Sequence, residues 1–101
     1  MKNGFEWQEQ WQTESVYHVP GLPRGDVETR AFRLDDGRDG YVQTDRLSGG
    51  MYSYLYVEGD LIEKYPQSWG FPTKAEAKKN CVRLLREYAE RSAIAAEIAR
   101  F

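Results

Sequence analysis

The spacing of apolar residues changes once along this chain, at Pro66–Gly70. Before this segment apolar and polar residues tend to alternate, as in β-strands, and after it apolar residues recur every third or fourth position, as in a helix. Strands followed by a single helix favour an α+β domain. We therefore predict one domain, residues 1–101, in which residues 1–65 form an antiparallel sheet of four to six strands and residues 73–101 form one long C-terminal helix that packs on it.

Gly- and Asp-rich turns divide the first two thirds of the chain into short candidate strands. The predicted strands are Phe5–Trp11, Val27–Leu34, Tyr41–Arg46, Met51–Glu58 and Leu61–Tyr65. Glu14–Val19 either continues the first strand or pairs with it, and Pro20–Asp26 interrupts regular structure. The short turns between the later strands favour hairpins, so we expect an antiparallel meander.

The helix has a start signal in the sequence. Thr73 and Glu76 have the spacing of a capping box, in which the hydroxyl and the carboxylate accept hydrogen bonds from backbone N–H groups that the first turn leaves unpaired. No Pro or Gly follows before the last residue. The apolar stripe that we expect to cover the sheet consists of Ala77, Cys81, Leu84, Leu85, Tyr88 and Ala95.

Composition and charge narrow the classes of protein to consider. With 41% apolar residues the chain is globular, and it has no apolar stretch long enough to cross a bilayer. Its single cysteine and the absence of a glycosylation sequon predict a cytoplasmic protein. Residues 1–70 carry twelve acidic and seven basic side chains, whereas residues 71–101 carry four and seven. This division favours protein partners of mixed charge over nucleic acid.

The reactive side chains provide no positive sign of catalysis. His18 is the only histidine, which excludes a pair of histidine ligands for a metal, and Cys81 lies in the apolar stripe, where a thiol packs as a small hydrophobe. Gly49-Gly50 lacks the context of a phosphate-binding loop. A Ser/His/Asp arrangement could still form from residues that are distant in sequence. We expect no enzyme activity, no cofactor and no metal site.

The segment Met51–Val57 favours a binding function. Three tyrosines alternate there with Met51, Ser53, Leu55 and Val57, so a strand would place them together on one face. If the helix covers the other face, the tyrosines remain for a partner; the alternative is a second small core in which other side chains cover them. The predicted partner-binding residues are Tyr52, Tyr54 and Tyr56.

A second apolar stripe lies near the end of the predicted helix. Ile94, Ile98 and Phe101 fall at i, i+4 and i+7, on a different side from most of the first stripe. These residues are the predicted oligomer contact of a homodimer, and a solvated helix end in a monomer is the alternative.

The junction Gly70–Ala77 resembles the strand-to-helix junction of phage-integrase arm-type DNA-binding domains. The resemblance extends over about residues 51–90 and implies a three-stranded sheet that reads DNA beside one helix. This sequence departs from that pattern, because Glu58, Asp60 and Glu63 stand where a DNA-facing sheet would carry Lys and Arg.

The overall layout also resembles small phage-encoded inhibitors of host defence, including some anti-CRISPR proteins. This resemblance is one of size and architecture, and it implies binding to a large defence complex by surface complementarity. The predicted function is therefore a non-enzymatic protein-binding module of phage or mobile-element origin that occupies a surface of a host nucleic-acid-targeting complex. The alternative is a small sheet-mediated DNA-binding module.

Overall fold

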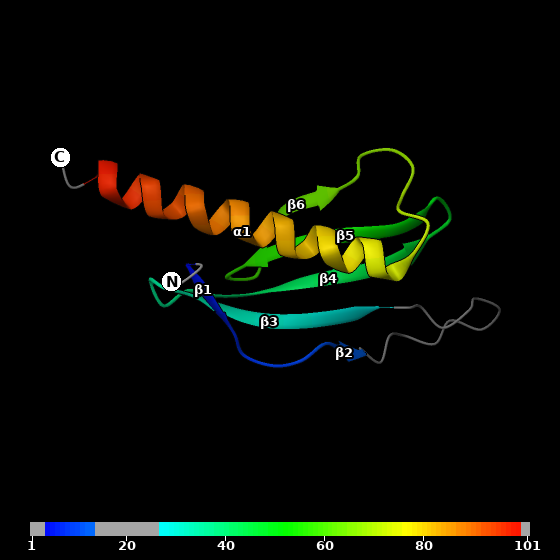
Figure 1. The fold of residues 1–101 in the computed structure, drawn as a ribbon, viewed down its shortest axis with the longest axis horizontal. Helices are drawn as coiled ribbons and strands as arrows, with labels where there is room; N and C mark the ends of the chain where they lie inside the picture. The colour runs from blue at the N-terminus through cyan, green and yellow to red at the C-terminus, as the bar shows by residue number, and fades with distance from the viewer. Residues whose placement is uncertain (1–3, 14–26, 100–101) are drawn as a thin grey trace.

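The computed structural model describes residues 4–13 and 27–99, which form one antiparallel sheet and one helix lying across it (Figure 1). The strands are β1 (Phe5–Trp7), β2 (Gln12–Thr13), β3 (Glu28–Leu34), β4 (Asp39–Leu47), β5 (Gly50–Val57) and β6 (Asp60–Tyr65), and the helix is α1 (Lys74–Ile98). The strand order in the described sheet is β1-β3-β4-β5-β6, and β2 also pairs with β3. The predicted α+β class and the single C-terminal helix are confirmed.

Strands β3 to β6 form the meander expected from the turn signals. Each lies within two residues of its predicted bounds. The turn between β5 and β6 has two central residues, Glu58 and Gly59, which both have positive φ angles, of 52° and 84°. Positive φ at both central residues matches a type I′ turn, whose twist suits a two-residue hairpin.

The predicted first strand, Phe5–Trp11, is confirmed only as far as Trp7, and residues 8–11 between β1 and β2 are not in a strand. Glu9 explains this interruption. Its carboxylate Oε1 accepts a hydrogen bond from the backbone N–H of Ala31 at 3.1 Å, and its carbonyl accepts one from Nε of Arg30 at 2.8 Å. Hydrogen bonds made by the side chains of Glu9 and Arg30 here take the place of regular backbone pairing between strands. The segments Glu14–Val19 and Pro20–Asp26 lie outside the described residues.

Helix α1 begins as predicted. The hydroxyl of Thr73 accepts a hydrogen bond from the backbone N–H of Glu76 at 3.2 Å, which satisfies one donor of the first turn. The buried residues of the helix are Ala77, Asn80, Cys81, Leu84, Leu85 and Ala89. The prediction for Ala95 is wrong, since it is exposed. The last turns of α1 extend past the strands (Figure 1).

The core fills the space between the sheet and the helix. Its buried residues are Phe32, Leu34, Val42, Leu55, Val57, Cys81, Leu84, Leu85 and Ala89, and Phe5, Trp7, Trp11 and Tyr88 pack against them. Trp7 meets Phe32 edge to face, with ring centroids 6.5 Å apart. The tryptophans of the first strands therefore complete the core on the helix side of the sheet. They do not cover the tyrosines of β5.

Candidate functional site

The two faces of β5 have different roles. Ser53 Oγ donates a hydrogen bond of 2.7 Å to the carbonyl of Ala77 in the helix, and Leu55 and Val57 belong to the core. These residues therefore point toward α1. Because successive side chains of a strand alternate, the tyrosines of β5 point to the opposite face, which we call the helix-free face. The alternation expected from the sequence is confirmed.

The three tyrosines predicted to bind a partner differ in accessibility. Tyr52 and Tyr54 are only 7% and 9% exposed, whereas Tyr56 is half-buried. Lys64 Nζ lies 5.0 Å from the ring centroid of Tyr52 and 5.8 Å from that of Tyr54. The hydroxyl of Tyr52 donates a 2.6 Å hydrogen bond to the carbonyl of Ser68. Tyr52 and Tyr54 are thus held within the protein, and Tyr56 has the more accessible ring.

A fourth tyrosine, which the sequence analysis did not select, joins this set. The strand register places Tyr41 of β4 directly opposite Tyr56, and the two rings stack with centroids 4.6 Å apart. On the other side of Tyr56, the register places the exposed Leu61 of β6. Tyr41 alternates with buried Val42, which is the pattern that could have identified it, but only the register shows which tyrosine it meets.

The helix-free face is a poor environment for negative charge. Burial raises the pKa of Asp45, although the backbone N–H of Arg46 and the ammonium of Lys64 act in the opposite direction. Burial, and then the nearby carboxylate of Asp45, raise the pKa of the Tyr54 hydroxyl. These shifts follow from desolvation of the charged forms, so the middle of the face is partly shielded from water.

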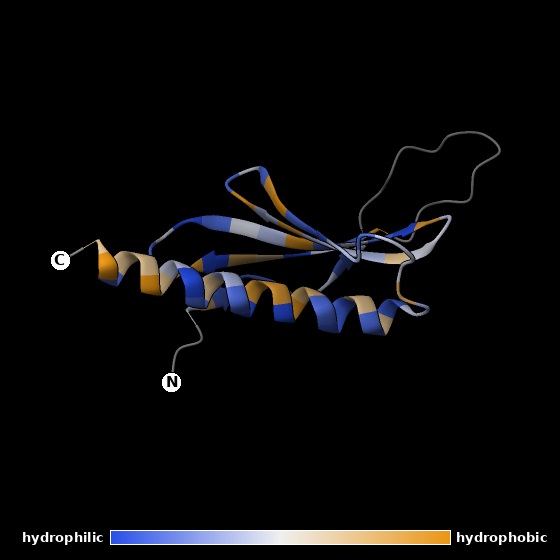
Figure 2. Cartoon of the chain, turned by 90° about the horizontal axis from the view of Figure 1, so that it is seen from above, coloured by the Kyte–Doolittle hydropathy of each residue, from blue (hydrophilic) through white to orange (hydrophobic). Residues whose placement is uncertain are grey.

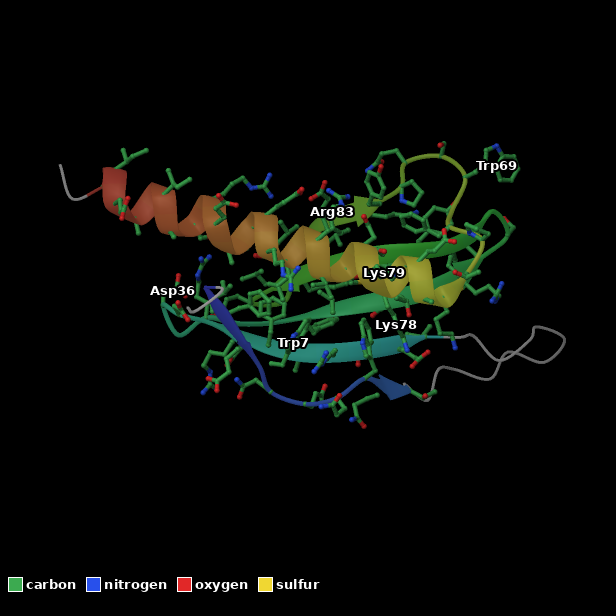
Figure 3. All side chains as sticks on the ribbon, viewed as in Figure 1. Trp7, Asp36, Trp69, Lys78, Lys79 and Arg83 are labelled. Atoms are coloured by element: carbon green, nitrogen blue, oxygen red, sulfur yellow. The ribbon has the colours of Figure 1, made fainter. Side chains whose placement is uncertain are left out.

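The loop between β6 and α1 presents a tryptophan to solvent. Trp69 is 80% exposed and projects from one end of the molecule (Figure 3). Its neighbours are fixed to the sheet: Gly70 N–H donates to the Gly49 carbonyl at 2.9 Å, and Phe71 and Met51 exchange two backbone hydrogen bonds of 2.7 and 2.9 Å. These backbone hydrogen bonds therefore hold the loop that carries the exposed Trp69 ring against the sheet.

Glycines allow this loop to approach the sheet closely. A methyl group added at Gly70 would lie 2.6 Å from the carbonyl oxygen of Met51, so only glycine fits. One added at Gly49 would lie 2.7 Å from the Tyr52 hydroxyl and 3.3 Å from the Trp69 ring, which places these two aromatic side chains at the same end of the sheet. We call the whole set the aromatic strip: Tyr41, Tyr56, Tyr54, Tyr52 and Trp69.

Sequence reasoning missed Trp69 because it belongs to no periodic segment. A useful signal was present, however. A large aromatic residue between Pro66 and Gly70, in a segment without strand or helix spacing, has no apolar face to join. Such a residue is a candidate for surface exposure.

The predicted oligomer contact lies on the part of α1 that extends past the sheet. Ile94 and Ile98 are 51% and 68% exposed, and Figure 2 shows hydrophobic residues in these last turns. Phe101 lies outside the described residues. Their contact with a second copy stays a prediction.

Cys81 has the properties of a packing residue. Its side chain is fully buried, and its thiol donates a 3.4 Å hydrogen bond to the Gln43 carbonyl. Burial raises the pKa of the thiol to about 11. A thiol of this kind forms little thiolate at neutral pH and is a poor nucleophile. His18 lies outside the described residues.

Comparison of the chain with protein-family models gives no match, and no curated protein or solved structure is significantly similar to it. In the part of the chain that the structure describes, no helix combines the length and apolar character needed to cross a membrane.

Proposed function

We propose that this chain is a non-enzymatic protein-binding module whose contact surface is the accessible part of the aromatic strip, namely Trp69, Tyr56 and Tyr41. The observation that carries the proposal is Trp69, a tryptophan with four fifths of its surface exposed on a loop fixed by backbone hydrogen bonds. Tryptophan and tyrosine supply large contact areas and are common binding hot spots. A rigid loop also lowers the entropy lost when a complex forms.

The charges around the strip support a protein partner rather than DNA. Arg33 on the helix-free face forms an ion pair of 2.8 Å with Asp39, and Lys64 lies over the rings of two tyrosines. The face also carries Asp45. A surface that binds DNA needs unpaired cations for the phosphates, because these contacts supply most of the affinity. An inhibitor that occupies a surface of a host nucleic-acid-targeting complex, as the sequence analysis predicts, would be one such protein-binding module. Identification of the partner would test this more specific function.

Capture from a host lysate on immobilised protein tests the proposal. The Trp69→Ala variant should fail to capture the partner protein that the unmodified chain captures. The Trp69→Phe variant should capture a reduced amount, because phenylalanine retains a smaller aromatic contact surface. Ile98→Ala is the matched control, since Ile98 is also an exposed apolar residue and lies on α1, away from the helix-free face. Equal capture by the Trp69→Ala variant would refute a contact through the strip.

The DNA-binding alternative has its own outcome. In a mobility-shift experiment with duplex DNA, the proposed module should show no tight binding at low salt. Tight binding that weakens steeply as salt rises, and that Lys64→Ala reduces, would favour the sheet-mediated DNA-binding module instead.

A further inference from the structure

A groove lies under the projecting part of α1, at the end of the molecule opposite Trp69; Figure 3 marks this end with Asp36. Its volume is about 390 Å³, within the range of roughly 300–1,000 Å³ found for ligand sites. Leu34, Asp35 and Asp36 line it on the side of the sheet, and Ala89, Ala93, Ala96 and Glu97 line it on the side of the helix. The groove therefore separates the helix from the turn between β3 and β4.

Arg38 holds the two walls of the groove together. Its Nε forms an ion pair of 2.8 Å with Asp36 in the turn. Its two terminal nitrogens donate hydrogen bonds to the Tyr88 hydroxyl at 3.0 Å and to Ser92 Oγ at 3.3 Å, both on the helix. One guanidinium thus connects the turn to α1 beside the groove.

The chemistry of the groove is apolar at its base and acidic beside it. Three alanines of the helix and Leu34 supply small apolar surface. The backbone N–H and guanidinium of Arg38 keep the pKa of Asp36 below its usual value, so this carboxylate is already satisfied. Within residues 4–13 and 27–99, no side chain forms an ion pair or hydrogen bond with the carboxylate of Asp35 or Glu97.

We propose that this groove binds a basic peptide segment of a partner protein, in which Lys or Arg lies beside small apolar side chains. The cations would meet the carboxylates of Asp35 and Glu97, and the small side chains would cover the alanine surface. Charge complementarity selects this occupant, because an apolar segment without cations would remove the two carboxylates from water without compensation. Among the described residues no group of acidic, His or Cys side chains converges as metal ligands do, which disfavours a metal ion.

A synthetic peptide provides the test. We would titrate the ¹⁵N-labelled protein with a blocked pentapeptide in which two arginines alternate with three alanines, and follow amide chemical shifts. The expected shifts are concentrated at Gly4, Ala89, Ala93 and Ala96. The same peptide with citrulline in place of arginine keeps the shape but lacks the charge, and it should bind about five- to twentyfold more weakly.

Two double variants distinguish binding of the peptide in the groove from non-specific electrostatic attraction of the peptide to an acidic protein. Asp35→Asn with Glu97→Gln should weaken peptide binding about five- to twentyfold. Asp60→Asn with Glu90→Gln removes the same charge from exposed positions outside the groove and should leave binding unchanged. Ala93→Leu should block binding by filling the groove, since Ala93 is exposed and leucine is also a good helix former.

Equal losses in the two double variants, or shifts spread over other acidic surfaces, would overturn the groove proposal. The result is independent of the aromatic strip, because Trp69→Ala should bind the peptide as the unmodified chain does. Failure of one proposal therefore leaves the other intact.

Discussion

The ring of Tyr41 stacks on the ring of Tyr56 with an interplanar angle of 15°. The two residues belong to adjacent strands and meet because the β4–β5 register places them directly opposite each other. Tyr54 lies next to Tyr56, with ring centroids 6.4 Å apart. The accessible part of the helix-free face is therefore built from neighbouring strands, and its central pair is one that no single strand could have supplied.

This stacked pair should be energetically coupled. Tyr41→Ala and Tyr56→Ala should each lower the free energy of unfolding, and the double variant should lose less than the total of the two single losses. We expect a coupling of about 0.5–1.5 kcal/mol, typical of aromatic pairs. Chemical denaturation of the four proteins measures it. Additive losses would show that the rings lie side by side without stabilising each other.

Tyr54 and Trp69 should respond differently to truncation. Tyr54 is nearly buried, so Tyr54→Ala should lower stability by about 3 kcal/mol. Trp69 is mostly exposed, so Trp69→Ala should change stability by no more than about 0.5 kcal/mol. Thermal and urea unfolding distinguish the two. If Trp69→Ala were the more destabilising change, Trp69 would be a packing residue and the proposed contact surface would lose its anchor.

Docking of α1 on the sheet depends on Leu84 and Leu85, which are both fully buried in the core. Leu84→Ala and Leu85→Ala should each lower the free energy of unfolding by about 2–5 kcal/mol. Ile94→Ala on the exposed side of the same helix is the control and should change it by about 0.5 kcal/mol or less. A large effect of the Ile94 change would instead indicate that this side is covered in a dimer, which sedimentation would reveal.

The cap at Thr73 should contribute about 1 kcal/mol. Thr73→Ala removes the hydroxyl that accepts from the Glu76 N–H, and should destabilise the protein by roughly this amount. Thr73→Ser keeps the acceptor and should retain most of the stability. Urea unfolding compares the three proteins. An equal loss in both variants would place the effect in the methyl group and not in the cap.

Cys81 should make stability depend on pH in the alkaline range. Its thiol has a pKa of about 11 in the folded protein, against an ordinary value of 9.0. The folded state therefore favours the protonated thiol, and the resulting stability is present below pH 9 and is lost as pH rises toward 11. The loss should approach about 2–3 kcal/mol. Cys81→Ala should show a shallower decline over this range when unfolding is measured at each pH. Equal slopes would mean that other groups cause the decline.

Local patterns in the sequence were sufficient to predict where most strands and the helix lie and which side chains share a face of a strand. Alternation put Leu55 and Tyr56 on opposite faces of one strand because that periodicity is a property of the extended backbone. The Thr73 cap was also predictable, since the hydroxyl and the N–H that it binds are three residues apart. Such relationships depend on neighbouring residues alone, so they needed no knowledge of the rest of the chain.

Only the tertiary structure decided which aromatic side chains are accessible. Tyr54 is nearly buried and Tyr56 is not, although the two occupy equivalent positions in the alternation. The neighbouring strand β6 places Lys64 opposite Tyr54 and Leu61 opposite Tyr56, so the two rings have different neighbours. Trp69 is exposed, and its loop is hydrogen-bonded to the β4–β5 hairpin, about twenty residues earlier in the chain. Ala95 fits the apolar spacing but is exposed, because the length of a helix does not specify how much of it the sheet covers.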